Sequence, residues 1–216
     1  MRRAGLLVAA LTLSAGGIVQ AQNADSIVAR SARVYAGLRS FSADFAQVID
    51  DPMVGVLKSR GHLIQTGQSR LSMQFSDPDG EAVVLDGTYA WIYTPSTTPG
   101  QVLRFDLARS ALGLNPVALL LDRPAERYRA DWVRQDSLAG APVDVVRLTP
   151  TIANLPFTEA TVWLDRRDAL PRRVEVKEPN RSGIRTITLT NVKTNVIVSS
   201  KTFTFTPPAG VRVVEQ

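Results

Sequence analysis

Residues that commonly carry catalysis or bind metals are scarce in this sequence. It contains one histidine, His62, and no cysteine, so thiolate metal sites, thiol nucleophiles and disulfides are excluded. A catalytic triad or zinc site built on histidine would depend on His62 alone, and no second ligand stands at metal spacing from it. We therefore interpret His62 as structural, predict no catalytic residue, metal or cofactor, and expect that the protein is not an enzyme.

The acidic residues give no sign of a catalytic site either. Most stand in predicted turns, where their side chains accept hydrogen bonds from nearby backbone N–H groups: Asp50, Asp51, Asp77, Asp79, Asp86 and Asp168. No glycine-rich phosphate loop follows a strand and opens a helix. Catalysis by a carboxylate pair is the alternative that these patterns leave open, although no spacing in the sequence singles out such a pair.

The first residues have the pattern of an export signal. Met1-Arg2-Arg3 is basic, residues 4–19 are apolar, and Val19-Gln20-Ala21 fits a cleavage site before Gln22. We predict a signal peptide over residues 1–21, which is removed, and a single soluble domain over residues 22–216 in the exported compartment. Loss of Arg2 and Arg3 leaves 23 basic against 20 acidic residues, and a formal charge of +3 gives no argument for a nucleic-acid partner.

One predicted hairpin is apolar on both faces. The run from Ala82 to Pro95 places two β-prone segments around Asp86-Gly87, a dipeptide typical of a two-residue type I′ turn that would pair Val84 with Tyr89. One face then carries Ala82, Val84, Tyr89, Trp91 and Tyr93, and the other Val83, Leu85, Thr88, Ala90 and Ile92. A hairpin with one solvent-exposed face alternates apolar with polar residues, and this one does not. We therefore expect protein to cover one face and protein or an apolar ligand to cover the other.

The rest of the chain predicts a sheet and two helical segments. Ile27, Val34, Tyr35 and Leu38 lie near one face of an amphipathic helix over residues 24–39. Leu71, Met73 and Phe75 alternate with polar residues in the clearest strand. Further strands are predicted over residues 40–47, 54–65, 101–105, 129–135, 142–149, 158–165, 171–178, 184–193 and 201–206. So many short strands favour an antiparallel sheet curled toward a barrel.

A second, short helix follows Asn115-Pro116, a capping residue before a proline at the first helical position. The aliphatic run 117–121 is too short to be a stable helix in water, so it must lie on an apolar surface as a flap. The flap and the two-faced hairpin together favour a cavity closed by a lid. Polar faces such as Arg70, Ser72 and Gln74 disfavour the alternative of a membrane-spanning barrel.

Three segments resemble, in order, motifs of the periplasmic outer-membrane lipoprotein carrier family (LolA type). Residues 40–47 resemble the family's Ser-Phe-x-Ala-x-Phe-x-Gln, and residues 86–95 resemble its Asp-Gly-x-x-x-Trp-x-Tyr-x-Pro. Residues 203–211 resemble its C-terminal Phe-Thr-Phe-x-Pro-Pro-x-Gly-Val. The order and spacing of the three motifs make the resemblance specific, and it spans nearly the whole mature chain.

The resemblance implies a mainly β fold, an incomplete antiparallel barrel of about eleven strands, with an α-helical lid over an apolar cavity for acyl chains. It implies a periplasmic carrier that takes acylated lipoproteins from an inner-membrane ABC transporter and gives them to an outer-membrane receptor, for which a monomer suffices. The predicted cavity lining is Phe45, Leu71, Met73, Phe75, Val84, Tyr89 and Trp91. The predicted lid is Val34, Tyr35, Leu38, Pro116, Val117, Leu119, Leu120 and Leu121.

The sequence departs from the family in one place. Family members often carry a basic residue and a proline just before the apolar strand, and that arginine is thought to tie the lid shut, but here the positions read Gly67-Gln68. Arg70 is close by but alternates onto the face opposite Leu71 and Met73. The sequence leaves open how the lid is held and which receptor receives the cargo. A carrier of another lipid or hydrophobic small molecule is the alternative function.

Overall fold

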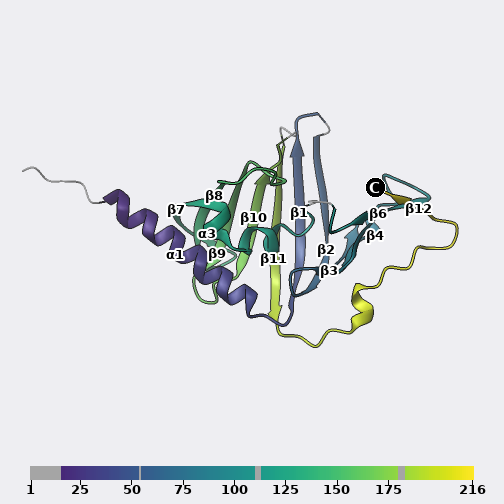
Figure 1. Ribbon diagram of the computed structural model, residues 1–216, viewed down its shortest axis with the longest axis horizontal. Coiled ribbons are helices and arrows are strands. Elements are labelled where there is room, and N and C mark those ends of the chain that lie inside the picture. Colours follow the sequence, from purple (N-terminus) through teal and green to yellow (C-terminus); the bar gives the residue numbers. More distant parts are fainter. Residues whose placement is uncertain (1–15, 54, 110–112, 180–182) are drawn as a thin grey trace, which may run out of the picture.

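Twelve strands of the computed structural model form one sheet in the order β12-β6-β5-β4-β3-β2-β1-β11-β10-β9-β8-β7 (Figure 1). The structure describes residues 16–53, 55–109, 113–179 and 183–216, with side chains from residue 24 onward. Only β12 and β6 pair in parallel; the other described neighbours are antiparallel. The strands are β1 (Phe41–Asp51), β2 (Gly55–Thr66), β3 (Arg70–Asp77), β4 (Asp79–Asp86), β5 (Tyr89–Tyr93), β6 (Gln101–Asp106), β7 (Tyr128–Leu138), β8 (Ala141–Pro150), β9 (Glu159–Asp165), β10 (Pro171–Lys177), β11 (Ile184–Thr194) and β12 (Arg212–Glu215).

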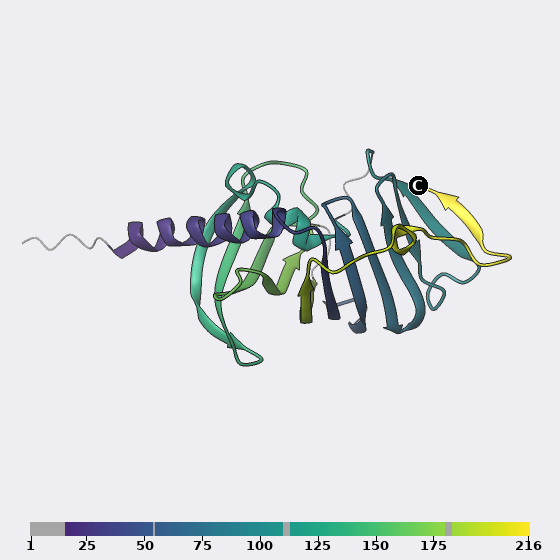
Figure 2. The same ribbon diagram turned by 90° about the horizontal axis from the view of Figure 1, so that it is seen from below.

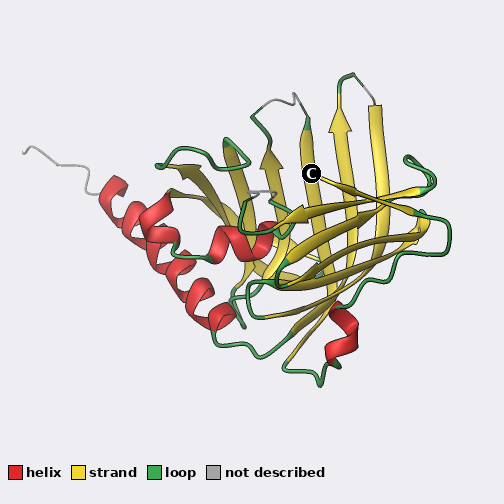
Figure 3. Cartoon of the chain, turned by 45° about the vertical axis from the view of Figure 1, so that its right-hand side comes forward, coloured by secondary structure: helices red, strands yellow, loops and turns green. Residues whose placement is uncertain are grey.

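The sheet does not close, because β7 and β12 are its two edges. Helices cover one side of it (Figure 3). The long helix α1 (Gly16–Ala36) packs on β7 and β8, and the short helix α2 (Pro116–Leu121) contacts α1 and β10. A third helix, α3 (Pro124–Arg127), joins α2 to β7. The predicted fold class, an unclosed antiparallel sheet with a helical lid, is confirmed.

The main core lies between the helices and the face of the sheet that they cover, here called the inner face. Alternation places every second residue of each strand on this face. Phe41, Ala43 and Phe45 of β1 therefore stand beside Leu63 of β2 and Leu71 of β3. The same core continues across β8, β9 and β10, where Leu148, Val162 and Val174 are almost completely buried.

The β4–β5 hairpin has the predicted faces but a different register. Val84 pairs with Trp91 rather than with Tyr89, so the loop is two residues longer than predicted. The Asp86 carboxylate accepts hydrogen bonds from the backbone N–H groups of Thr88 (2.8 Å) and Tyr89 (2.7 Å) and from the Trp91 indole (2.9 Å). Partial burial opposes ionisation of Asp86, but these donors hold the pKa of its carboxyl below its usual value. A shift of two residues leaves each side chain on its predicted face.

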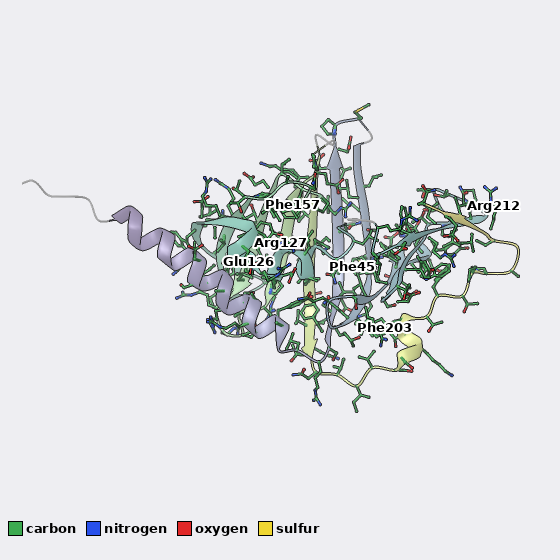
Figure 4. All side chains as sticks on the ribbon, viewed as in Figure 1. Phe45, Glu126, Arg127, Phe157, Phe203 and Arg212 are labelled. Atoms are coloured by element: carbon green, nitrogen blue, oxygen red, sulfur yellow. The ribbon has the colours of Figure 1, made fainter. Side chains whose placement is uncertain are left out.

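The C-terminal segment differs from the prediction. Residues 201–206 form no strand: Ser200–Phe203 is a 3₁₀ helix, η1, which contacts β3 and β4, and Phe205 beyond it packs on Trp91 and Tyr93 of β5. Figure 2 shows this C-terminal strap, residues 195–211, crossing in front of the strands, and its ring contacts with Trp91 and Tyr93 lie on the face of the sheet opposite the inner face. Phe203 is buried there (Figure 4). The Phe-Thr-Phe alternation resembles a strand because both phenylalanines point at the sheet. The short strand β12 (Arg212–Glu215) was not predicted from the sequence.

The N-terminal helix also departs from its predicted bounds. It ends at Ala36, where the Gly37 N–H bonds to the carbonyls of Arg33 and Val34, and it begins at Gly16. Most of the predicted signal peptide, residues 1–15, lies outside the described residues, and residues 16–21 form the first turns of α1. In the part of the chain that the structure describes, no helix has the length and hydropathy needed to cross a membrane.

Candidate functional site

A small void lies between the inner face and α2. Its volume is about 20 Å³, room for about one water molecule. The sheet lines it with Phe41, Leu63, Gln65, Leu71, Met73, Ile187 and Leu189, and the lid segment lines it with Leu114, Asn115, Pro116 and Val117. Because the lining is apolar apart from Gln65 and Asn115, the void suits a hydrocarbon chain. A long chain can enter only if α2 moves.

A larger cleft opens to solvent beside α2. It encloses about 320 Å³ and is lined partly by aliphatic residues, among them Leu85 of β4, Leu107 just after β6 and Leu119 of α2. Leu114 and Asn115 line both the cleft and the void, so the two spaces adjoin at the start of the lid. At the rim, Arg127 forms an ion pair with Asp122 (2.9 Å). The cleft is therefore the natural way into the closed space.

Four of the predicted cavity residues lie on the inner face. Leu71 and Met73 line the void directly and are buried. Phe45 and Phe75 belong to the same core, with their rings edge to face at 5.0 Å between centroids. Figure 4 labels Phe45 in the middle of β1. These residues form one apolar surface that runs from beneath α2 toward the opposite end of β1.

The prediction is wrong for Val84, Tyr89 and Trp91, which lie on the outer face. The register pairs Val84 with Ser72, the residue between Leu71 and Met73, so Val84 points away from the void. The Trp91 ring contacts the Phe205 ring of the strap at 5.7 Å, and the Arg104 guanidinium lies over Tyr89 at 4.5 Å. The hairpin has two apolar faces, and its aromatic face is the one that the strap covers. Its inner face carries the aliphatic residues Val83, Leu85 and Ala90.

The predicted lid residues all pack on the inner-face core. From α2, Val117, Leu120 and Leu121 are buried with Pro116, and Leu119 lies on the cleft side. Val34 and Tyr35 of α1, and Leu38 just after it, join the same core. The Asn115 side chain caps α2 by accepting a hydrogen bond from the Ala118 N–H (3.1 Å), and the Tyr128 hydroxyl donates to the Leu119 carbonyl (3.0 Å).

Comparison with known proteins identifies the relatives of this fold and lid. Residues 36–206 match the family described as outer membrane lipoprotein carrier protein LolA. The chain belongs to this family. The outer-membrane lipoprotein carrier proteins of Salmonella typhimurium (strain LT2) and Salmonella typhi are each 25% identical to it over 217 residues, covering 100% of this chain and 99% of theirs. The resemblance read from the three motifs is thereby confirmed, as is the prediction of a carrier rather than an enzyme.

Solved structures of low sequence identity share the fold. An uncharacterized conserved protein from Thermus thermophilus superposes with a TM-score of 0.58 at 11% identity, covering 90% of this chain and 100% of that one. A chain of the Pseudomonas aeruginosa MucA/MucB complex has a TM-score of 0.51 at 16% identity, covering 89% of this chain and 63% of that one.

The lid of this family member is tied by an uncharged cluster. The Gln65 side-chain carbonyl accepts hydrogen bonds from the Tyr35 hydroxyl (2.5 Å) and from the Asn115 amide (2.8 Å). The Gln65 amide donates to the Gly67 carbonyl (2.6 Å). Burial raises the pKa of Tyr35, so this hydroxyl stays protonated and remains a donor. The Tyr35–Gln65–Asn115 cluster thus links α1, β2 and α2 without any charge.

Sequence reasoning missed this cluster, although one signal was available. Gly61, Leu63 and Gln65 alternate onto the inner face, and Gln65 is the polar residue in that series. A buried amide needs partners, and only 3% of Gln65 is exposed. Arg70 is exposed and takes no part, in keeping with its predicted outer face.

His62 has neighbours that the sequence did not reveal. Its ring contacts Ser42 Oγ (3.0 Å, Nε2) and Asp44 Oδ1 (2.7 Å, Nδ1), the connectivity of a catalytic triad. A hydrogen bond from Asn191 (2.7 Å) and the contact with His62 lower the pKa of the Asp44 carboxyl. However, Ser42 is only 4% exposed and is paired with Ile64 of β2 and Lys193 of β11, so its hydroxyl is not accessible to a substrate.

Proposed function

We propose that this protein is a periplasmic carrier that binds the acyl chains of lipoproteins between α2 and the inner face. The observation that supports this most directly is the apolar void, closed by a helix of aliphatic residues, in a member of the lipoprotein carrier family. In this proposal residues 1–21 are removed on export, and the remaining domain shuttles cargo from an inner-membrane ABC transporter to the outer membrane. Phe45, Leu71, Met73 and Phe75 form the surface that the chains contact.

The energetics explain why a closed resting state is useful. Transfer of hydrocarbon to water costs ~0.8 kcal/mol per CH₂, so several long acyl chains cannot cross an aqueous space unaided. An empty open cavity would expose its own apolar lining to water, at a similar free-energy cost per CH₂. With α2 closed, Val117, Leu120 and Leu121 cover the sheet. Cargo can replace these side chains one for one, so opening is easy only when an acyl chain is present.

The Tyr35–Gln65–Asn115 cluster supplies the closing contact that a charged residue is thought to supply elsewhere in the family. A neutral hydrogen bond contributes about 0.5–1.5 kcal/mol net, because water can replace either partner once the site opens. Two such bonds hold Gln65 to the elements above it. They set the orientation of the lid while remaining weak enough to break when cargo arrives.

Met73→Glu tests the proposal. Its carboxylate would lie in the void beneath α2, so we expect α2 to leave the sheet and the variant to stay folded with the charge hydrated. Circular dichroism should show the strands intact, and binding of a hydrophobic fluorescent probe and of acylated peptide should fall at least about tenfold. Gln74→Glu is the matched control, one residue along on the outer face, and should change neither property.

Two results would contradict this proposal. An unfolded Met73→Glu protein would mean that the inner face is permanent core, and normal binding by the folded variant would mean that cargo lies elsewhere.

Mass spectrometry of material that co-purifies from the native periplasm identifies the cargo class. Acylated polypeptide supports lipoprotein transport, whereas a lipid without polypeptide would make the protein a carrier of that lipid on the same fold.

A further inference from the structure

The two ends of α2 are held to the rest of the molecule in different ways. At the N-terminal end, the Asn115 amide donates a hydrogen bond to the Gln65 side chain (2.8 Å), and both groups are neutral. At the C-terminal end, Asp122 forms an ion pair with Arg127 (2.9 Å), and the two side chains are 27% and 18% exposed. A partly buried, hydrogen-bonded ion pair is stronger than a bond between neutral amides and is little screened by salt. The C-terminal end is therefore held more firmly.

Arg127 is itself fixed to the sheet. Its carbonyl accepts a hydrogen bond from the Thr151 N–H (2.9 Å), and the next residue, Tyr128, begins β7, which pairs with β8. The Tyr128 hydroxyl donates to the Leu119 carbonyl (3.0 Å). Figure 4 labels Arg127 on α3, which packs against α1. Helix α3 thus belongs to the fixed part of the molecule, and Asp122 ties the end of α2 to it.

The link between α2 and α3 is two residues long. Asp122 is extended, and Arg123 has φ 46° and ψ 54°, in the left-handed region. This conformation is unfavourable for a residue with a Cβ atom, so the surrounding contacts must hold it. Pro124 then begins α3. A change in the dihedral angles of Arg123 would turn α2 as a unit without moving α3.

The void and the start of the cleft lie at the other end of α2. Residues 114–117 line the void, whereas Leu120 and Leu121 pack in the core near the C-terminal end. The helical rise puts the N-terminal end about 9 Å from Asp122, so a turn of about 30° lifts that end by about 5 Å. This exceeds the separation of about 4 Å between two carbon atoms in contact. A modest turn is therefore enough to admit a hydrocarbon chain.

We propose that α2 turns about Asp122 and Arg123, so that acyl chains enter beneath its N-terminal end while α3 stays in place. The inference rests on the proposed carrier function. It adds the direction of opening, the route of entry and two residues that position the lid, Asp122 and Arg127. The neutral bond between Asn115 and Gln65 breaks on opening, and the ion pair persists. Each chain enters with its methyl end first, which leaves the attached polypeptide at the cleft.

Two disulfides, one on each side of the hinge, test this inference in the mature full-length protein, which has no cysteine of its own. Ala29→Cys with Ala125→Cys joins α1 to α3, because both residues line one small void. After oxidation we expect binding of a palmitoylated peptide with the wild-type Kd, because α3 does not move on opening. Met73→Cys with Val117→Cys joins the N-terminal end of α2 to the sheet, and its oxidation should abolish binding.

Distances between spin labels give a second measurement that does not depend on disulfide formation. The reference label is attached to Gln74→Cys, an exposed position of β3. The second label is attached to Leu119→Cys in α2 or to Ala125→Cys in α3. Leu119 is three residues from Asp122, so the palmitoylated peptide should move its label by about 2 Å and leave the label on Ala125 in place. Double electron–electron resonance measures both distances.

Asp122→Asn tests the role of the ion pair. Loss of the charge frees the C-terminal end of α2, so without cargo the distribution of distances between Leu119 and Gln74 should broaden at least about twofold. Asp122→Glu keeps the charge and should restore the narrow distribution. Asp131→Asn is the matched control, because it removes the carboxylate of an ion pair with Arg129 (3.3 Å), and its distribution should match the wild type. A loss of stability alone would not broaden these distances in the folded protein.

Three results would overturn the inference. If the disulfide between α1 and α3 abolished binding, or if Ala125 moved as far as Leu119, α2 and α3 would open together. If Asp122→Asn left the distances unchanged, the ion pair would not be the fixed point. Failure of the carrier function gives a different result: the wild-type protein, without any disulfide, would not bind the palmitoylated peptide, and the inference would fall with it.

Discussion

The hairpin of β4 and β5 is apolar on both faces, and the two faces of the sheet are covered in different ways. The inner face is covered by α2, which leaves a void of about 20 Å³ and is tied by the uncharged Tyr35–Gln65–Asn115 cluster. The outer face is covered by the strap, whose Phe205 packs on Trp91 and Tyr93. The strap continues into β12, which is hydrogen-bonded along β6. The inner cover is held by side-chain packing and side-chain hydrogen bonds, whereas the outer cover continues into backbone pairing.

The difference explains how one sheet can be both a stable scaffold and a container. Backbone pairing and aromatic contacts make the outer cover part of the fold, and Arg104 adds a hydrogen bond to Glu215 at 3.0 Å. The inner cover is a six-residue helix whose aliphatic side chains can be replaced by any other hydrocarbon. Mobility is therefore expected on the inner face, and variants that fix one cover or weaken the other test this expectation.

Fixing the inner cover should have the largest effect. The chain has no cysteine, so Met73→Cys with Val117→Cys introduces the only thiols, on two residues that line the same void. Under oxidising conditions the disulfide should hold α2 on the sheet and abolish binding of acylated peptide, and a reductant should restore it. Val102→Cys with Val213→Cys, directly opposite across β6 and β12, should leave binding unchanged. Equal inhibition by both disulfides would show that the strap moves as well.

Truncating one side chain in each cover should separate stability from binding. Phe203→Ala removes a buried ring from the strap, and we expect the free energy of unfolding to fall by about 3–5 kcal/mol while the folded fraction still binds cargo. Val117→Ala removes two methyl groups from α2 and should cost about 1–2 kcal/mol. Denaturation by urea gives both values. A Val117→Ala protein less stable than the Phe203→Ala protein would show that the inner cover contributes more to the fold than the strap does.

Sequence reasoning succeeded where a pattern is local. The alternation of Leu71, Met73 and Phe75, and the Asn115-Pro116 start of α2, are read from neighbouring residues and hold in the structure. The assignment of Val84, Tyr89 and Trp91 to the cavity failed because alternation tells which residues share a face but not which face is inside. That choice depends on the strap, more than a hundred residues later in the chain.

The same limit applies to the polar contacts. Gln65 receives one donor from α1 and one from the start of α2, so its partners stand 30 and 50 residues away. Ser42, Asp44 and His62 meet only because β1 and β2 are paired in one particular register. No spacing in the sequence encodes such contacts, and the three-dimensional arrangement of the strands is needed to find them.

The smallest effect is expected from removing the polar tie of the inner cover. Gln65→Leu keeps the size of the side chain but leaves the Tyr35 hydroxyl and the Asn115 amide unpaired in the closed state. Water satisfies both groups when α2 opens, so the substitution should favour the open state and speed uptake of a hydrophobic probe about tenfold. Tyr35→Phe removes one donor, while Asn115 still bonds to Gln65, so its effect should be smaller. Stopped-flow fluorescence measures both rates, and global stability should change little because the strap face is untouched.

The effect should be the same between about pH 5 and 9, because burial raises the pKa of Tyr35 above its usual value near 10 and no other member of the cluster titrates. If Gln65→Leu slowed uptake instead, the glutamine would be helping cargo to enter rather than holding the lid, and the contrast between the two covers would rest on the apolar contacts of α2 alone.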